Sequence, residues 1–358
     1  MLAVLATFIL LLNPSKIMYL QSIAHSTPRN SLTQKECWEV LNQSEALNDL
    51  TQRSVLLLEK ILLGDSGIER RHFETDSVET LFSLDAESLN QQFERAAPQL
   101  ASQALCKALD AAELQATDLD ALFICTCSGY LCPGLSSYVS EKMGLKSNAY
   151  LQDIVGLGCG AAIPTLRSAA GFLATMPEAK VAVIAVEICS AAFYLDNDPG
   201  VLISACLFGD AASASIWSMD PNRTGYRISN FDTLHRPEER ELLRFVNSGG
   251  KLRNKLHRSV PEKAASAVAQ LYSQTQHSAG EQIANHTGGR DVIDALEQVL
   301  PSKLSPSRAT LKRYGNTSSP SVLITLQEML ETSTPAKELW LTSFGAGFAA
   351  HSVSLKQE

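Results

Sequence analysis

Residues 148–188 read NAYLQDIVGLGCGAAIPTLRSAAGFLATMPEAKVAVIAVEI. The stretch opens with a strand-like segment, 148–154, and passes through a glycine-rich turn into apolar positions at helical spacing over 160–175. It ends in the uninterrupted apolar run 181–188, which is typical of a strand covered on both faces. A strand, a helix and a second strand in succession predict an α/β fold.

The same alternation of strands and helices extends to both ends of the chain. Periodicity predicts helices over 34–64 (two helices), 85–110, 134–144, 261–278, 290–300 and 319–330. It predicts strands from Met18, over 121–125, 212–219 and 225–234, and a pair within 338–355. A weak duplication of this layout predicts two similar halves, 18–222 and 223–358.

Composition excludes several classes of protein. Hydrophobic residues make up 45% of the 358 residues and charged residues 19%, which is the opposite of a disordered chain. The net charge of −8 provides no basic footprint for nucleic acid, so we expect no nucleic-acid partner. No segment approaches about 18 consecutive apolar residues, so no transmembrane helix is expected.

The apolar run LAVLATFILLL (2–12) has the length of a signal peptide. No Lys or Arg precedes it, and no small-x-small cleavage site follows it. Three interpretations of residues 1–17 stay open: a translation start at Met18, a short membrane tether and a true signal.

The chain has eight cysteines, too few for a disulfide framework in a chain of this length. We expect free thiols in a reducing compartment, the cytoplasm. The spacing of Cys125, Cys127 and Cys132 includes no paired set of ligands, so no metal site is expected.

Cys159 lies at the junction between the strand 148–154 and the following helix. A helix N-terminus favours an anion, which predicts an accessible thiolate and makes Cys159 the thiol expected to alkylate fastest. The alternative is a small residue packed under the helix. Gly158 and Gly160 permit a tight turn on either side.

His286 and Asn316 precede helices in the second half, His286 before the Gly288-Gly289 turn. Each has a structural alternative, a hydrogen-bonded core histidine and a helix-capping asparagine. With Cys159 they form a Cys–His–Asn set suited to acyl transfer. Papain-like proteases have the same residue order, but their C-G-[SA]-C-[WY] motif is absent.

Several motifs in order resemble the type III polyketide synthases, the chalcone synthase-like branch of the thiolase fold. They span about residues 18–358 and imply a layered αβαβα fold of two similar halves. The motifs that carry the resemblance are GLGCGAAIPTLRSA (156–169), VEICS (186–190), LFGDAASASI (207–216), NHTGGRDVID (285–294), YGNTSSPSVL (314–323) and SFGAGFAAHSVSL (343–355).

The resemblance implies an acyltransferase that condenses a starter acyl thioester with a malonyl thioester by decarboxylative Claisen condensation. Cys159 would carry the acyl chain, while His286 and Asn316 would stabilise the enolate. No cofactor is implied beyond thioesters of CoA or of a carrier protein, and the family implies a homodimer. Phe208 would shield the nucleophile, and Cys127, Cys132, Asn254 and Gly345 would border the substrate.

The sequence departs from the family pattern at several of these positions. Thr287 replaces the proline of H-P-G-G, and Ser343 and Ala346 replace a glycine and the proline of G-F-G-P-G. Asn254 falls at a second aromatic gate position. These changes leave the starter, the number of extensions and the mode of cyclisation open.

The run KLRNKLHR (251–258) has four basic residues and no acid. It is either a solvated face or a docking patch for CoA or an acyl carrier protein at the tunnel mouth. We expect at least one substrate to arrive on a carrier protein. Two alternatives to a polyketide synthase stay open: a ketoacyl-carrier-protein synthase III-like enzyme that condenses once, and a silent thiolase-fold subunit.

Overall fold

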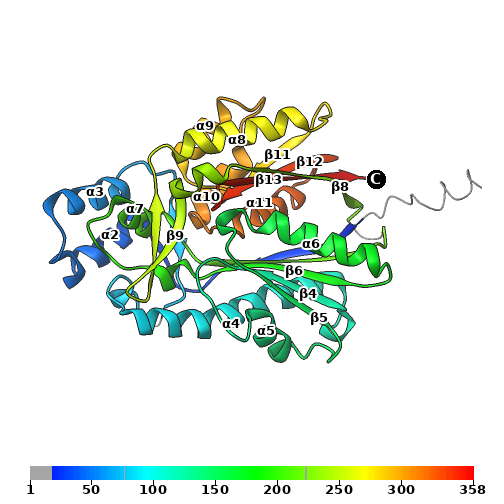
Figure 1. Cartoon of the computed structure of the whole chain (residues 1–358), viewed down its shortest axis with the longest axis horizontal. Coiled ribbons are helices and arrows are strands. Elements are labelled where there is room, and N and C mark those ends of the chain that lie inside the picture. Colours follow the sequence, from blue (N-terminus) through cyan, green and yellow to red (C-terminus); the bar gives the residue numbers. More distant parts are fainter. Residues whose placement is uncertain (1–17, 76, 222–223) are drawn as a thin grey trace, which may run out of the picture.

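The computed structural model describes residues 18–75, 77–221 and 224–358, and Figure 1 shows their arrangement in alternating layers of helices and sheet. The strands are β1 (Tyr19–Ser26), β2 (Ser31–Thr33), β3 (Arg70–His72), β4 (Ala121–Cys125), β5 (Tyr150–Ile154), β6 (Val181–Glu187), β7 (Ala211–Ser218), β8 (Tyr226–His235), β9 (Leu243–Ser248), β10 (Lys251–Leu256), β11 (Gln282–Asn285), β12 (Glu338–Gly345) and β13 (Ala349–Gln357). The helices are α2 (Gln34–Asn42), α3 (Gln52–Leu63), α4 (Ala86–Ala112), α5 (Leu135–Met143), α6 (Ala162–Thr175), α7 (Pro199–Leu207), α8 (Val260–Gln274), α9 (Arg290–Glu297), α10 (Ser305–Tyr314) and α11 (Ser321–Leu330).

The main sheet repeats one strand pattern twice. In the first half β1 pairs antiparallel with β7, β7 antiparallel with β6, and β6 parallel with β4. In the second half β8, β13, β12 and β11 pair in the same order and with the same directions. The halves join through the pair Tyr19 and Arg227 on β1 and β8. The predicted construction from two similar halves is therefore confirmed, while the boundary at residues 222 and 223 lies outside the described residues.

Helices cover both faces of each half-sheet. Figure 1 shows α6 and α11 between the two half-sheets, α4 and α5 on the outer face of the first, and α8 and α9 on the outer face of the second. The middle layer is apolar because α6 packs Ile163 and Leu166 there, α11 packs Leu323, and the half-sheets contribute Phe123 and Leu341. Five layers, αβαβα, result, as the family resemblance implies.

The structure contains several elements that the sequence did not predict. They are α7, α10, the strand pair β2 and β3, and the hairpin of β9 and β10, and of these α7 and the hairpin lie beside the candidate site. The predicted helix 160–175 begins two residues later, at Ala162, because 158–160 form a single 3₁₀ turn. Within residues 18–75, 77–221 and 224–358, no helix has the length and apolarity needed to cross a membrane. The three interpretations of residues 1–17 concern a segment outside the described residues.

Candidate active site

The candidate nucleophile occupies the turn between β5 and α6. Cys159 is the central residue of the 3₁₀ turn Gly158–Gly160, and only 9% of it is exposed. Gly158 has φ +58°, and a Cβ there would lie 3.0 Å from the amide nitrogen of Ala346. Glycine is therefore required for the close approach of the two loops. The predicted strand-to-helix junction is confirmed, although Cys159 precedes the first turn of α6.

The surroundings of Cys159 favour the thiol over the thiolate. Burial raises the pKa of Cys159 to about 12, and the hydrogen bond that Ser318 Oγ donates to its sulfur, at 3.2 Å, only partly offsets this. The sequence-based expectation of an accessible thiolate in the resting site is therefore wrong. Desolvation of a fully buried anion outweighs the field of a neighbouring helix terminus.

His286 follows β11 and is almost fully buried. Its Nδ1 lies 2.7 Å from Ser321 Oγ, and Ser321 Oγ donates its own hydrogen to the carbonyl of Ser318. Ser321 can then only accept from the ring, so Nδ1 carries the hydrogen and Nε2 is the free proton acceptor. Burial lowers the pKa of His286 to about 4, so the imidazole is neutral in the resting site.

Asn316 follows α10 and has a fixed amide orientation. Its Oδ1 accepts from the amide of Ser318 at 2.9 Å, and its Nδ2 donates to the carbonyl of Gly288 at 3.0 Å. Pro320, not Asn316, is the N-cap residue of α11, so the capping alternative does not apply. One Nδ2 hydrogen is left for another acceptor.

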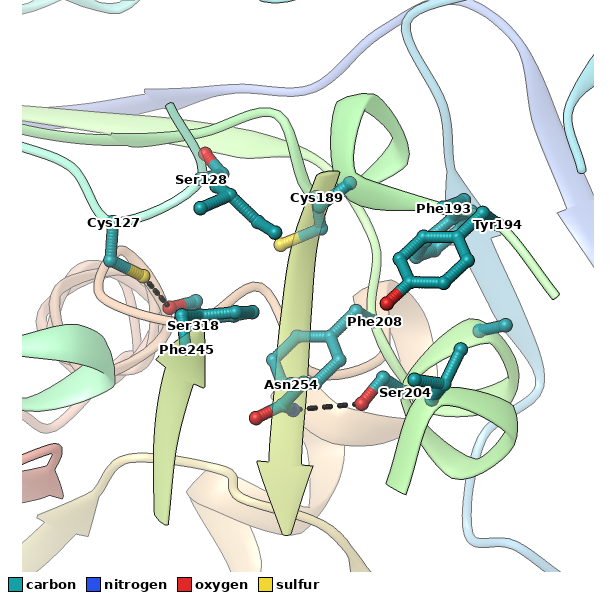
Figure 2. Close-up of a pocket in the computed structure, with 14 residues that line it drawn as sticks. Cys127, Ser128, Cys189, Phe193, Tyr194, Ser204, Phe208, Phe245, Asn254 and Ser318 are labelled. Carbon is teal, nitrogen blue, oxygen red and sulfur yellow. Dashed lines mark hydrogen bonds between the residues drawn. The ribbon is translucent and has the colours of Figure 1, made fainter. Parts of the chain in front are cut away.

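The three residues meet in one cleft of about 910 Å³, which Cys159, His286 and Asn316 all line. A second, smaller cavity of about 30 Å³, called the inner cavity below, shares lining residues with the cleft. Figure 2 shows this inner cavity, with Cys127 and Ser318 on one side and Asn254 on another. The structure thus brings the predicted catalytic set together from three separate turns.

The predicted pocket residues divide into two groups. Phe208 and Asn254 line both cavities, and Cys127 lines the inner one. Cys132 is exposed and lines neither cavity. Gly345 also lines neither, because it packs against the nucleophile turn, where a Cβ would lie 2.4 Å from the carbonyl oxygen of Leu157. The structure therefore does not bring Cys132 and Gly345 of this chain to the substrate.

Sequence reasoning placed Glu187 in a motif but assigned it no role. Its fully buried carboxylate accepts from the amides of Cys127 and Ser128 at 3.0 Å and from the hydroxyl of Ser319 at 2.6 Å. Ser318 links it to the nucleophile, because its hydroxyl also lies 3.3 Å from Glu187 Oε1. The serines of YGNTSSPS were the available signal for this network. In the described part of the chain, no group of three His, Cys, Asp or Glu side chains could hold a metal ion.

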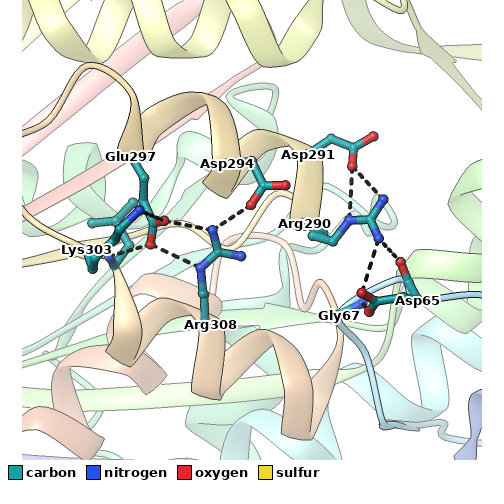
Figure 3. A network of polar contacts seen from close by, with 9 residues as sticks. Asp65, Gly67, Arg290, Asp291, Asp294, Glu297, Lys303 and Arg308 are labelled. Atoms are coloured by element: carbon teal, nitrogen blue, oxygen red, sulfur yellow. Dashed lines mark hydrogen bonds and ion pairs between the residues drawn. The ribbon is translucent and has the colours of Figure 1, made fainter.

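Ion pairs brace the elements that carry His286 and Asn316. Figure 3 shows Arg308 of α10 bonded to Asp294 and Glu297 of α9, at 2.6 and 2.9 Å. Arg308 lowers the pKa of Glu297 to about 2, so this pair persists in mild acid. The helix after His286 is thereby tied to the helix before Asn316.

The four bases of the run 251–258 have different surroundings. Lys251 stacks on the ring of Tyr194, and Arg253 pairs with Asp196 and Asp198. On β10 these residues alternate with Leu252, Asn254 and Leu256, which line the cavities. Of the four bases only Arg258 lines the cleft, so a docking role for the other three stays a prediction.

Three Lys and Arg side chains line the cleft. Lys60 of α3 and Arg258 line it, and neither has a charged partner among the described residues. Arg290 also lines it, but Figure 3 shows its guanidinium bonded to Asp65 and Asp291. Lys60 and Arg258 are therefore the cations available to an anionic ligand.

Two family models cover most of the chain. The model described as FAE1/type III polyketide synthase-like protein matches residues 12–235. The model for the chalcone and stilbene synthase C-terminal domain matches residues 240–355.

Characterised relatives agree with these matches. A 1,3,6,8-tetrahydroxynaphthalene synthase of Streptomyces coelicolor is 28% identical over 91% of this chain and 88% of its own length. A phloroglucinol synthase of Pseudomonas fluorescens is 24% identical over 90% of this chain and 94% of its own.

Solved structures have the same fold. The crystal structure of the Streptomyces coelicolor synthase matches with a TM-score of 0.83 and 27% identity, over 95% of this chain and 99% of that one. The structure of PKS-I from the brown alga Ectocarpus siliculosus matches with a TM-score of 0.85 at 20% identity, over 96% of this chain and 98% of that one, which shows the shared fold.

These findings support the polyketide synthase interpretation and not the single-condensation alternative. The chain has the thiolase-like fold, and its relatives are acyltransferases that condense malonyl thioesters with loss of CO₂. With both halves matched by family models and the Cys–His–Asn set gathered in one cleft, the chain belongs to the type III polyketide synthase family.

Proposed function

We propose that this enzyme transfers an acyl group from CoA to Cys159 and extends it there with malonyl-CoA units. The observation that carries the proposal is the convergence of Cys159, His286 and Asn316 on one cleft of about 910 Å³. Three turns that are far apart in the sequence supply a nucleophile, a proton acceptor and an amide donor, the groups that acyl transfer requires.

The cycle begins with Cys159 as a neutral thiol and His286 as a neutral imidazole. Cys159 attacks the carbonyl carbon of the acyl-CoA and gives its proton to Nε2 of His286. The bond between the carbonyl and the CoA sulfur breaks, and the CoA thiolate takes a proton from water. His286 keeps the cysteine proton as an imidazolium ion, with Nδ1–H held by Ser321 at 2.7 Å.

Decarboxylation follows when malonyl-CoA enters the cleft. The bond to the carboxylate breaks, CO₂ leaves, and the electron pair moves onto the thioester oxygen as an enolate. The His286 imidazolium and the free N–H of Asn316 stabilise this negative charge. The anionic substrate thus supplies the counter-charge that a buried imidazolium requires. No metal or further cofactor is needed for this step.

Condensation closes the cycle. The enolate carbon attacks the acyl carbon on Cys159, the carbon–sulfur bond breaks, and His286 returns its proton to the thiolate. The product is a β-ketoacyl-CoA that is longer by one ketide unit, and its acyl group returns to Cys159 with release of CoA when the next round begins. Phe208 borders both cavities and shields the malonyl group from water.

CoA fits the charges at the cleft better than a carrier protein does. Lys60 and Arg258 line the cleft and are available to phosphate groups. The outward-facing bases of β10 that a carrier protein would need are partly engaged, since Arg253 pairs with Asp196 and Asp198. We therefore assign delivery of both substrates to CoA, and delivery by a carrier protein becomes the alternative that kinetics can decide.

A homodimer is supported by an exposed edge of the sheet. β5 is the last strand in the order of the main sheet, so one side of it is unpaired. Apolar side chains are exposed around it: Tyr150 is 48% exposed, Val155 51%, and Tyr130 of the neighbouring loop 76%. Pairing of two such edges would cover these groups. Cys132 would then contact substrate only if a second copy brought it there.

The oligomeric state and the compartment have separate tests. Sedimentation should give a dimer for the native chain and a monomer for Val155→Arg, and a native monomer would exclude the homodimer. All eight cysteines are free, which supports a reducing compartment, and we assign the enzyme to the cytoplasm. Fractionation of cells expressing the full chain would check that assignment.

Product analysis tests the proposed function. Purified enzyme is incubated with malonyl-CoA and a series of acyl-CoAs, and products are identified by mass spectrometry. We expect products that contain more than one malonyl-derived unit, and none from Cys159→Ala. Products with a single unit from every starter would favour the single-condensation enzyme, and no product from any starter would favour a silent subunit.

A further inference from the structure

Asn254 lies at the passage between the two cavities. It and Phe208 are the two residues that line both the cleft of about 910 Å³ and the inner cavity of about 30 Å³. Figure 2 shows both side chains at this cavity and the hydrogen bond from Asn254 to Ser204. Ser318, whose hydroxyl lies 3.2 Å from Cys159 Sγ, also lines the inner cavity, so an acyl chain on Cys159 that enters this cavity lies beside Asn254 and Phe208.

The orientation of the Asn254 amide follows from its hydrogen bonds. Ser204 Oγ donates its single hydrogen to the carbonyl of Gly200 at 2.6 Å. Toward Asn254, at 2.7 Å, Ser204 Oγ can then only accept, so the amide atom beside it is the donor Nδ2. Oδ1 is therefore the atom on the other side of the amide.

Asn254 Oδ1 has no hydrogen-bond partner. The residue is only 5% exposed, and its Oδ1 is buried without a donor among the described residues. Its neighbours in the inner cavity include the apolar side chains of Phe208, Phe245 and Leu252, which offer no N–H or O–H. A buried carbonyl oxygen without a donor is unfavourable, so its place at a substrate passage points to a donor on the ligand.

We propose that Asn254 Oδ1 accepts a hydrogen bond from an O–H group of the acyl chain and thereby selects hydroxyl-bearing acyl groups. The inner cavity has room for about two water-sized groups, which suits a short polar end rather than an aromatic ring. This inference rests on the proposed function, because it names the class of acyl group that the same site takes.

Two sources can supply the O–H group. A starter can carry a hydroxyl on its acyl chain, or the β-keto group made by the first condensation can present its enol. The chemistry at Asn254 is the same in both cases. Primers of matched length distinguish them, since ω-hydroxyacyl-CoAs carry a hydroxyl before any condensation and acetoacetyl-CoA carries an enolisable β-keto group.

The experiment measures kcat/KM for pairs of primers with malonyl-CoA. Short ω-hydroxyacyl-CoAs are compared with acyl-CoAs of the same chain length, and acetoacetyl-CoA with butyryl-CoA. We expect the native enzyme to prefer the O–H-bearing member of at least one pair by roughly ten- to a hundredfold. The pair that shows the preference identifies the source of the hydroxyl.

Variants test whether Asn254 causes the preference. Asn254→Leu keeps the shape of the side chain and removes the acceptor. In this variant the ratio of kcat/KM for the O–H-bearing primer to kcat/KM for its matched primer should fall to about one. Ser204→Ala frees the amide to rotate and should lower the ratio part of the way. Asn247→Leu makes the same chemical change on the exposed part of β9 and should leave the ratio as in the native enzyme.

Two results would overturn the inference. A native ratio near one in both arms would mean that Oδ1 selects nothing, and this test needs no variant. A preference that survives in Asn254→Leu would move the selectivity to another residue. Absence of condensation with every primer would contradict the proposed function as well, so the two failures can be told apart.

Discussion

Phe208 and Asn316 face each other in a parallel bridge that joins the two halves of the chain. The amide of Asn316 donates to the carbonyl of Leu207 at 2.9 Å, and the amide of Gly209 donates to the carbonyl of Asn316 at 3.1 Å. Buried Arg71 donates to the Phe208 carbonyl at 2.8 Å. Phe208, which borders the growing chain, and Asn316, whose side-chain amide faces the enolate, are therefore held in a fixed relative position.

Asn316→Asp should separate acylation from decarboxylation. An aspartate keeps the acceptor for the Ser318 amide but loses the N–H donors, and its charge repels both the Gly288 carbonyl and the enolate. We expect malonyl-CoA decarboxylation to fall by roughly 10²–10³-fold, as when an oxyanion-hole donor is lost. Acyl transfer to Cys159, measured by intact-protein mass spectrometry, should fall far less. An equal loss of both steps would contradict the role assigned to Asn316.

Gly345→Ala should displace the nucleophile. The added Cβ would lie 2.4 Å from the Leu157 carbonyl oxygen and 2.6 Å from the Gly160 amide nitrogen, so the turn that holds Cys159 must move. We expect activity to fall by at least roughly tenfold, because small misplacements of a reacting group are costly.

Gly171→Ala is the matched control for that change. Gly171 lies within α6, and apart from its chain neighbours and the backbone of its own helix no atom comes within 4 Å of an added Cβ. Alanine should stabilise the helix by about 0.5–1 kcal/mol and leave activity intact. Thermal unfolding and initial rates measure both effects, and full activity in Gly345→Ala would show that the turn tolerates the shift.

Alkylation of Cys159 should rise with pH. Because burial raises the pKa of Cys159 to about 12 and lowers that of His286 to about 4, the resting pair is neutral across the physiological range. Only the thiolate reacts with iodoacetamide, so its rate should increase about tenfold per pH unit between pH 6 and 9. The exposed Cys106 and Cys132 should react before Cys159 at pH 7. A rate for Cys159 that stays constant from pH 5 to 8 would mean a preformed ion pair.

Charge reversal at the cleft should discriminate between carriers. Lys60→Glu and Arg258→Glu should each raise KM for malonyl-CoA severalfold, and the native KM should rise with ionic strength. Lys255→Glu on the outward face of β10 is the control and should leave the KM for malonyl-CoA unchanged. N-acetylcysteamine thioesters, which lack phosphates, should be insensitive to all three changes. A higher KM only for Lys255→Glu with a carrier-protein substrate would reverse the assignment to CoA.

The sequence predicts the fold and the three central residues because their signals are local. The apolar run 181–188 and the glycine-flanked Cys159 can each be recognised within a window of about ten residues. The hairpin of β9 and β10 was missed although Lys251 to Leu256 alternate polar and apolar residues, because the bases suggested a charged patch instead. α7 was missed because PGVLISACL is apolar on all sides and has no helical stripe.

What could not be predicted depends on contacts between distant segments. The low pKa of His286 and the high pKa of Cys159 follow from burial that only the packed halves produce. Ser321, which is 35 residues away in the sequence, orients the His286 ring. The Oδ1 atom of Asn254 has no donor because Ser204 donates its hydrogen to Gly200 and accepts from Nδ2 of Asn254. No motif or regular spacing in the sequence indicates any of these contacts.

The most direct test of the account is to locate the growing chain. Enzyme given an acyl-CoA and malonyl-CoA is quenched during turnover, digested and mapped by mass spectrometry. The account predicts acyl adducts on the peptide that contains Cys159, in a series that increases by one ketide unit (C₂H₂O) at a time. Extended adducts on the Cys127 or Cys132 peptide instead, with turnover retained in Cys159→Ala, would contradict it.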